Sequence, residues 1–380
     1  MAGLVGTPED RRKTAEHNSA FTNQATNTDI LNENVTQWLL GTVKIPKDPA
    51  HPKAEIPDTY SVRARLHACL DAPNYTVFSN TESEAQWIKV ARERDSSTHC
   101  STVYSLESPH NAIHLALGGF YEKGVYHASP IEGANGDIGD SNVSGFDPIF
   151  FFHHCYVDYV FSVWQKRKNL TRRGSLTVIN SNPPYPGTFL KKGQPPHHKK
   201  NDHLDMTTLL EPFKKSNGQY YTSDDVTDLR DLDVAYGIGS LDHFKDHSVP
   251  VPNSFGIISL SSNPFVATLK VQGINRAKHD GSFVVRVYAT KPGTTDKIAI
   301  AREAFFSRFN VENCSNCRNH LEPERYFSLD KRSQEYLVGF CGREDGKIAW
   351  EVEIHAADGI KMRTMLSKEA QDDWPKVEDS

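Results

Sequence analysis

The chain has 380 residues, of which 37% are hydrophobic and 10% aromatic, so it can bury a substantial core, and its length favours two domains. Its formal net charge of -5 at pH 7 comes without any basic stripe, which argues against nucleic acid as a partner. The apolar runs are too short to cross a membrane, and the N-terminal sequence MAGLVGTPEDRRKTAEHN lacks the apolar segment of a signal peptide. We therefore expect a cytoplasmic protein without membrane contact, whose six cysteines stay reduced.

The N-terminal two thirds of the chain has helical periodicity. Apolar side chains recur at every third or fourth position, and Gly41 marks one helix end. A loop rich in Gly, Asn and Ser, residues 129–145, separates the last two helical segments. The pattern predicts helices over residues 26–40, 59–70, 82–94, 109–117 and 148–167.

From about residue 253 the apolar positions alternate with polar ones, as in half-buried antiparallel strands. The fold class that we predict is α+β, with a helical domain over residues 1–246 and an antiparallel β-sandwich domain over residues 253–380. A proline-bearing segment, residues 247–254, joins the two. The predicted strands lie within residues 265–274, 282–290, 297–306 and 347–357.

Two segments concentrate histidine. In ESPHNAIHLALGGF, residues 107–120, His110 and His114 are four positions apart and so share one helix face. In FDPIFFFHHCYVDYVFSVW, residues 146–164, the pair His153 and His154 lies in a strongly aromatic run, where a buried imidazole needs a metal or a hydrogen-bond partner. Spacing alone leaves two interpretations open, a metal site or buried histidines bonded to backbone carbonyls.

The segments HNAIH and GFDPIFFFHHCYVD resemble the second copper-binding half of the tyrosinase family, the type 3 copper proteins that include catechol oxidases and hemocyanins. The family pattern is His-Asn-x-x-His, a loop, and then Asp-Pro-x-Phe-x-x-His-His-x-x-x-Asp. The resemblance covers residues 100–167 most strongly. It reappears at 308–322, where it resembles the C-terminal β-domain of fungal and hemocyanin-like members. It implies metal ligands at His110, His114 and His154.

The resemblance also implies roles for residues around these ligands. Glu107 matches a carboxylate that holds a water near the metals, and Asn111 matches the residue that helps to orient this water. His153 is the neighbour of a ligand and lies outside its first coordination shell. Asp158 matches an acid of the second shell, where groups that orient ligands are expected.

Two differences from the family pattern change the expected chemistry. Members of the family have an upstream helix pair with three more histidines and a PWHR-like signature, and we expect this chain to hold only the second-copper half. Tyr159 stands where the family usually has arginine. Three histidines hold one metal ion, which favours Zn²⁺ as Lewis acid or water activator, with copper as the alternative.

This combination resembles the hemocyanin-like, zinc-dependent cyclopenases of fungal quinolone alkaloid biosynthesis. The resemblance implies a lyase of secondary metabolism that converts a cyclopenin-type benzodiazepinedione epoxide into a viridicatin-type quinolone. Glu107 would act as general acid and base on this small aromatic substrate, and Asn111 would orient it. A homodimer is one arrangement that would cover a face left by a missing half-domain.

Two alternatives remain open at this stage. One is a copper phenol oxidase of the tyrosinase or catechol oxidase type, which acts on phenols with O₂. The other is a non-catalytic remnant that binds metal for stability or binds a partner.

Four smaller expectations concern packing. We expect Phe150, Phe151 and Phe152 to pack in the core, Cys155 to be buried, and Tyr159 to be a packing change. Cys314 and Cys317 form a single CxxC without a second pair, which indicates a turn of the β-domain rather than a zinc ribbon.

Overall fold

The computed structural model describes most of the predicted elements but not the whole chain. The predicted helix over residues 26–40, the segment 247–254 and the pair Cys314 and Cys317 lie outside the described residues. The described residues are 42–44, 55–57, 61–94, 103–118, 137–182, 184–190, 199–237, 267–279, 281–291, 293–308, 311, 318, 320–329, 337, 339–340, 349–356, 361–365 and 376–379.

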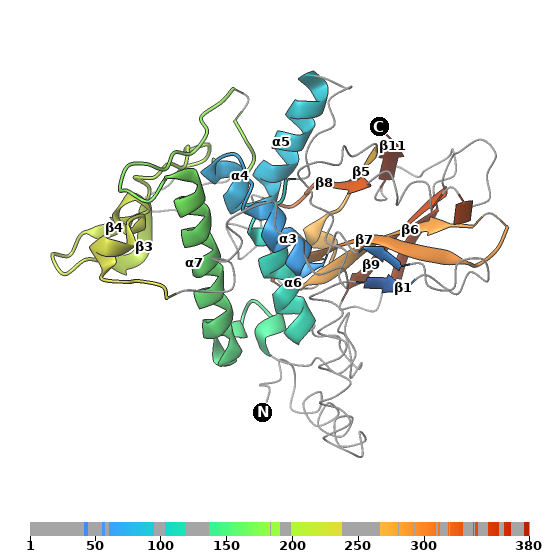
Figure 1. Cartoon of the computed structure of the whole chain (residues 1–380), viewed down its shortest axis with the longest axis horizontal. Helices are drawn as coiled ribbons and strands as arrows, with labels where there is room; N and C mark the ends of the chain where they lie inside the picture. The colour runs from blue at the N-terminus through green and yellow to red at the C-terminus, as the bar shows by residue number, and fades with distance from the viewer. Residues whose placement is uncertain are drawn as a thin grey trace, which may run out of the picture.

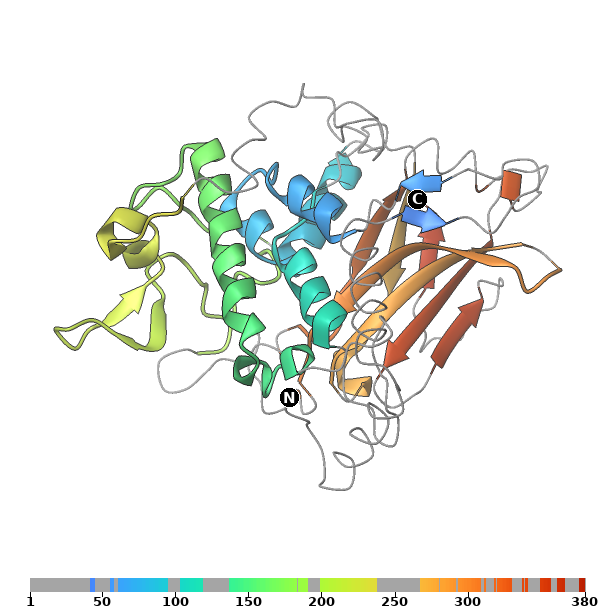
Figure 2. The same cartoon turned by 60° about the horizontal axis from the view of Figure 1, so that its bottom comes forward.

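The helices lie on one side of the molecule together with the hairpin β3-β4, and the two larger sheets lie on the other side (Figure 1). Helix α6 lies between α7 and the strands, and it contacts β7 (Figures 1 and 2). Four predicted helices, at 59–70, 82–94, 109–117 and 148–167, are confirmed. The helices are α3 (Val62–Cys69), α4 (Tyr75–Ser79), α5 (Thr81–Arg94), α6 (Glu107–Gly118) and α7 (Ile149–Lys168).

Polar side chains and backbone conformation define several helix ends. The Ser61 side chain accepts a hydrogen bond from the Ala64 amide (3.1 Å) at the start of α3. Helix α7 ends at Asn169, whose left-handed backbone (φ of 57°) lets its amide bond the last carbonyls. Two short 3-10 helices, η1 (Asp137–Gly139) and η2 (Ser144–Phe146), connect α6 to α7 within the predicted loop. Within the described residues, no helix is both long and apolar enough to cross a bilayer.

The strands pair antiparallel, in the orders β10-β9-β6-β7 and β11-β5-β8, and two short hairpins, β1-β2 and β3-β4, stand apart. The four strands predicted from alternation are confirmed as β5, β6, β7 and β9. That the two larger sheets form a sandwich stays a prediction. The strands are β1 (Thr42–Lys44), β2 (Glu55–Pro57), β3 (Leu209–Lys214), β4 (Tyr220–Thr222), β5 (Ala267–Gln272), β6 (Phe283–Thr290), β7 (Lys297–Phe305), β8 (Arg325–Leu329), β9 (Ala349–Ala356), β10 (Lys361–Met365) and β11 (Lys376–Asp379).

A single cluster of buried apolar side chains extends from the helices into the sheets. On the helical side, the Trp164 ring stacks on Phe78 with centroids 4.5 Å apart, and its indole N–H donates to the Ala72 carbonyl. On the sheet side, Phe283 stacks on Phe305 with centroids 4.7 Å apart. The division into domains 1–246 and 253–380 stays a prediction.

Buried charged groups join the helices to the sheets. The Arg65 guanidinium on α3 lies 2.9 Å from the Glu303 carboxylate on β7, and their side chains are only 1% and 5% exposed. Arg65 also donates to the Ser108 hydroxyl (2.8 Å), in the first turn of α6. Removing one partner of such a pair leaves an uncompensated buried charge, so this network fixes the position of α6 against β7.

Glu84 is a buried carboxyl on α5 whose environment disfavours its charge. Its side chain accepts a hydrogen bond from the Ser105 amide (2.6 Å) and is 7% exposed. Burial, reinforced by the negative charge of Glu303, raises the pKa of Glu84 from 4.5 to about 8. The folded chain therefore keeps a proton on Glu84 at pH values where the unfolded chain has lost it.

This difference predicts that the free energy of unfolding decreases as the pH rises from about 5 to about 8. The contribution of Glu84 amounts to several kcal/mol, at about 1.4 kcal/mol per pKa unit. Glu84→Gln cannot ionise and still offers an oxygen to Ser105, so its denaturation midpoint should exceed that of the wild type at pH 8 and match it at pH 5. Urea denaturation across this pH range checks the prediction, and equal pH dependence in both proteins would contradict it.

Candidate metal centre

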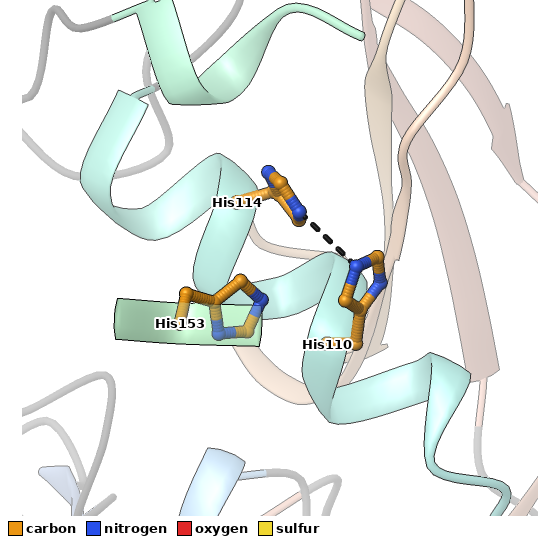
Figure 3. A group of neighbouring side chains, drawn as sticks. All are labelled: His110, His114 and His153. Carbon is orange, nitrogen blue, oxygen red and sulfur yellow. Dashed lines mark hydrogen bonds between the residues drawn. The ribbon is translucent and has the colours of Figure 1, made fainter. Parts of the chain in front are cut away.

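Helices α6 and α7 bring the three predicted ligands together. His110 and His114 lie one turn apart on α6, and their Nε2 atoms are 3.1 Å apart. The Nε2 atom of His154, on α7, lies 3.1 Å from that of His110. Figure 3 shows the two α6 imidazoles turned toward each other. The structure therefore unites residues that are 44 positions apart in the chain.

The opposite nitrogen of each ring is held by an oxygen. Carbonyl oxygens only accept hydrogen bonds, so each Nδ1 donates and each Nε2 carries a lone pair. The three hydrogen bonds run from His110 to Asn111 Oδ1 (2.9 Å), from His114 to the Ile138 carbonyl (2.6 Å) and from His154 to the Phe150 carbonyl (2.8 Å).

This arrangement fits a metal ion. Lone pairs that face each other at 3.1 Å repel unless a cation lies between them. Nitrogens around a tetrahedral ion with bonds of about 2.0–2.1 Å lie about 3.3 Å apart, close to the observed spacing. Burial lowers the pKa of His114 to about 2 and also lowers that of His110, so both rings are neutral and can coordinate. Imidazole nitrogens suit both copper and zinc.

A fourth histidine lies within this group. The group whose potential ligand atoms all lie within 4.8 Å of one another consists of His110, His114 and His153, which we predicted to lie outside the first shell, and it does not include His154 (Figure 3). The His153 side chain is buried and its Nε2 atom has no hydrogen-bond partner. Its ring stacks against that of His110, with centroids 5.1 Å apart.

Glu107, the first residue of α6, lies beside the ligands and is held by Thr81. Its Oε2 atom accepts hydrogen bonds from the Thr81 amide (2.8 Å) and the Thr81 hydroxyl (3.0 Å). Burial raises the pKa of Glu107, but the positive charges of Arg276 and Arg325 and the bonds from Thr81 outweigh it and lower the pKa overall. At neutral pH this carboxylate can accept a proton and has none to donate.

Asn111 and Asp158 occupy different surroundings. The Asn111 oxygen accepts a hydrogen bond from His110 Nδ1, so Asn111 orients the His110 ring, and its predicted role at a water stays a prediction. Asp158 is exposed and accepts a hydrogen bond from the Tyr236 hydroxyl. Its predicted second-shell role also stays a prediction. Tyr159 is buried edge-on against Tyr236, with ring centroids 5.5 Å apart, so it packs in the interior, and its difference from the family's arginine stays a prediction.

A cavity of about 370 Å³ opens beside the ligands. Its walls are mostly apolar and aromatic, and they include two carboxylates, Glu107 and Asp158, and the imidazoles of His110 and His154. This volume accommodates a small aromatic molecule. The lining residues are Tyr75, Phe78, Ser79, Leu106, Glu107, His110, His154, Val157, Asp158 and Phe161.

The predicted packing of the α7 N-terminus is wrong in part. Phe151 and Phe152 are 64% and 73% exposed, and Cys155 is exposed as well. Phe150 is partly buried and contacts the His154 ring, with centroids 3.9 Å apart. A helical segment that is apolar on all sides does not reveal which side is buried, and the first turns of α7 are covered on one side only.

Sequence reasoning missed the residues that reach the centre from other elements. Thr81 begins α5 and binds Glu107, and Arg325 on β8 donates to the Thr81 hydroxyl (2.8 Å). Phe306, just after β7, stacks on the His114 ring with centroids 4.1 Å apart. No motif marks these positions, since only the tertiary structure brings them to the histidines.

Comparison with known proteins identifies the family. The family model described as the common central domain of tyrosinase matches residues 5–167. The structure of the tyrosinase from Burkholderia thailandensis at high pH is 34% identical to this chain, with a TM-score of 0.67 over all of this chain and 69% of its own. A second structure of this tyrosinase, at low pH, is 37% identical to this chain, with a TM-score of 0.69 over 67% of its own length. The chain belongs to the tyrosinase family.

Two curated tyrosinases extend this likeness. Tyrosinase HcTyr2 of Hahella sp. is 39% identical over 344 residues, which cover 89% of this chain and 58% of that protein. The tyrosinase of Aspergillus oryzae is 34% identical, over 88% of this chain and 60% of that protein. The chain thus spans somewhat under two thirds of the length of these curated relatives.

These relatives correct the predicted function. The predicted cyclopenase-like lyase is wrong. The relatives that match most of this chain are tyrosinases, which are oxidoreductases. Nothing in them supports zinc or quinolone alkaloid biosynthesis. The family match begins at residue 5, so the likeness extends beyond the two histidine segments. That the chain holds only the second-copper half stays a prediction.

The geometry predicts that His154 is needed for metal binding. His154→Gln removes one of three converging lone pairs, so copper affinity should fall at least about 100-fold, beyond the cost of losing an outer partner. His203→Gln is the matched control, because His203 Nε2 contacts the Ile179 carbonyl (3.3 Å) away from the centre. Competitive copper titration measures both variants. Unchanged affinity in His154→Gln would exclude His154 as a ligand.

Proposed function

We propose that this chain is the copper-binding part of a phenol oxidase, which oxidises phenols with O₂ through copper held by His110, His114 and His154. The observation that carries the proposal is that His110 Nε2 lies 3.1 Å from the Nε2 atoms of both His114 and His154, beside a cavity sized for one aromatic ring. The tyrosinase names of the relatives support copper over zinc, and copper is also the ion that imidazole donors bind more tightly.

Copper, when bound, supplies the exchange of electrons with oxygen and substrate. The chain itself binds and orients the phenol and moves its proton. Phe78 and Phe161 stack in the cavity wall with centroids 5.8 Å apart, and they present apolar surface to an aromatic ring. A phenol has a pKa near 10, so at neutral pH its hydroxyl needs a nearby base. The ionised Glu107 on the same wall is positioned to accept this proton.

A chain of hydrogen bonds keeps Glu107 available as this base. Arg325 on β8 donates to the Thr81 hydroxyl (2.8 Å), which donates to Glu107 (3.0 Å). The backbone amide of Thr81 donates to the same carboxylate oxygen (2.8 Å). These bonds stabilise the charged form of Glu107 and fix one of its oxygens, which leaves the other for the substrate.

The proposal includes a second copper ion. Reduction of O₂ by type 3 copper proteins uses two copper ions, and the described residues form one histidine cluster, on α6 and α7. We therefore propose that the ligands of the second ion come from outside the described residues, either from the rest of the protein or from a second copy. The predicted homodimer remains compatible with this arrangement.

The main test is oxygen-dependent oxidation of a simple monophenol and of a catechol by the copper-loaded protein. Glu107→Gln should lower kcat by about 100-fold or more, as expected for loss of a general base, with unchanged copper content. His154→Gln should abolish turnover, and His203→Gln should leave it intact. Turnover that persists without O₂, or in metal-free protein, would refute the phenol oxidase.

The support from Thr81 predicts a shift in pH dependence. Thr81→Ala removes one donor to the ionised Glu107, which loses about 1.5 kcal/mol of stabilisation, so the pKa of Glu107 rises. Activity needs the ionised form, so its acidic limb should move to higher pH. Thr81→Ser keeps the hydroxyl and should restore the original profile. Identical profiles for all three proteins would show that Thr81 has no such role.

A further inference from the structure

Four imidazole rings, rather than three, form a compact group between α6 and α7. His110, His114, His153 and His154 lie at nearly equal separations, since all six distances between their ring centroids fall between 4.6 and 5.3 Å. Four rings at equal spacing correspond to the corners of a tetrahedron. This is the arrangement that surrounds a four-coordinate ion.

The fourth ring has a nitrogen without a partner. His153 is 6% exposed and its Nε2 atom has no hydrogen-bond partner. A buried polar atom in this state is costly and calls for a ligand. The ring of His153 also forms a hydrogen bond with the backbone of His110, which does not involve the Nε2 atom.

The neighbouring rings cannot satisfy this nitrogen. The Nδ1–H groups of His110, His114 and His154 already donate to oxygens, so their remaining Nε2 atoms carry lone pairs. The rings around His153 therefore have no hydrogen to donate to its Nε2 atom. A cation satisfies all four nitrogens at once.

We propose that His153 is a fourth nitrogen ligand, which binds the ion held by His110, His114 and His154 when this centre contains a single ion. Its potential ligand atom lies within 4.8 Å of those of His110 and His114. Coordination requires the nitrogens to lie about 3.3 Å apart, and rotation about the side-chain torsions of His153 can bring its nitrogen to this spacing.

The fourth ligand changes what the ion can do. Metal centres that react keep an open coordination position, whereas closed centres with four protein ligands only hold the ion. If His153 were bound, a four-coordinate ion would have no open position for water, oxygen or phenol. His153 then stores one ion tightly and keeps it unreactive, and its withdrawal opens the position that a substrate takes.

Pulsed EPR of the protein with one equivalent of Cu²⁺ counts the coordinated imidazoles. We expect four in the wild type and three in His153→Phe, with a coordinated water, detected in deuterated buffer, in the variant alone. The copper dissociation constant of His153→Phe should rise about tenfold or more. His203→Gln is the matched control and should retain four. Three imidazoles in the wild-type protein overturn the proposal, and this count needs no variant to fold.

The inference concerns metal binding and does not rest on phenol oxidation. A protein with four coordinated imidazoles that oxidises no phenol would refute the proposed function and support the role of His153. A protein that oxidises phenols and shows three imidazoles with one ion would refute the role of His153 alone.

Discussion

The mutual approach of imidazole lone pairs is the constraint on which this molecule depends. In His110, His114 and His154 the ring hydrogen is on Nδ1, because Nδ1 donates to a fixed oxygen. Each Nε2 atom therefore carries a lone pair. Without a cation the rings would repel, and the 3.1 Å spacing between them would cost stability. We expect metal binding and correct packing of α6 against α7 to be linked, so that the ion belongs to the folded structure as well as to the chemistry.

The β-strands belong to the centre as much as the helices do. The ion pair of Arg65 and Glu303 fixes the N-terminus of α6 on β7, and Arg325 reaches from β8 to the group that holds Glu107. Phe306 covers one face of a ligand ring. A buried charge that loses its partner is destabilising, so these contacts transmit any displacement of the sheet directly to the first turn of α6. The arrangement explains why one buried cluster extends through both parts of the chain.

Much of the fold could be predicted from the sequence, and the reasons for the failures are physical. The long helices and the strands with strict alternation were predicted correctly, because an element that is buried on one side has apolar residues at regular intervals in the sequence. Strand β3 was missed, since Pro212 argues against a strand and its partner β4 has only three residues. The resemblance to a family predicted the ligands. It did not predict the oxygens that accept hydrogen bonds from their Nδ1 atoms, because the Ile138 carbonyl reaches His114 only through tertiary structure. The predicted lyase reaction was wrong because it was inferred from the expectation that the chain holds only the second-copper half. The described residues do not test this expectation.

The oxygens that accept hydrogen bonds from the three predicted ligands differ in kind, and the difference has an evolutionary consequence. His114 and His154 are oriented by main-chain carbonyls, which every amino-acid substitution preserves, whereas His110 depends on the side chain of Asn111. Replacement of residue 111 would thus remove the hydrogen-bond acceptor of one imidazole and leave the acceptors of the other two in place. Selection, natural or in the laboratory, would adjust the redox potential of the ion through this position.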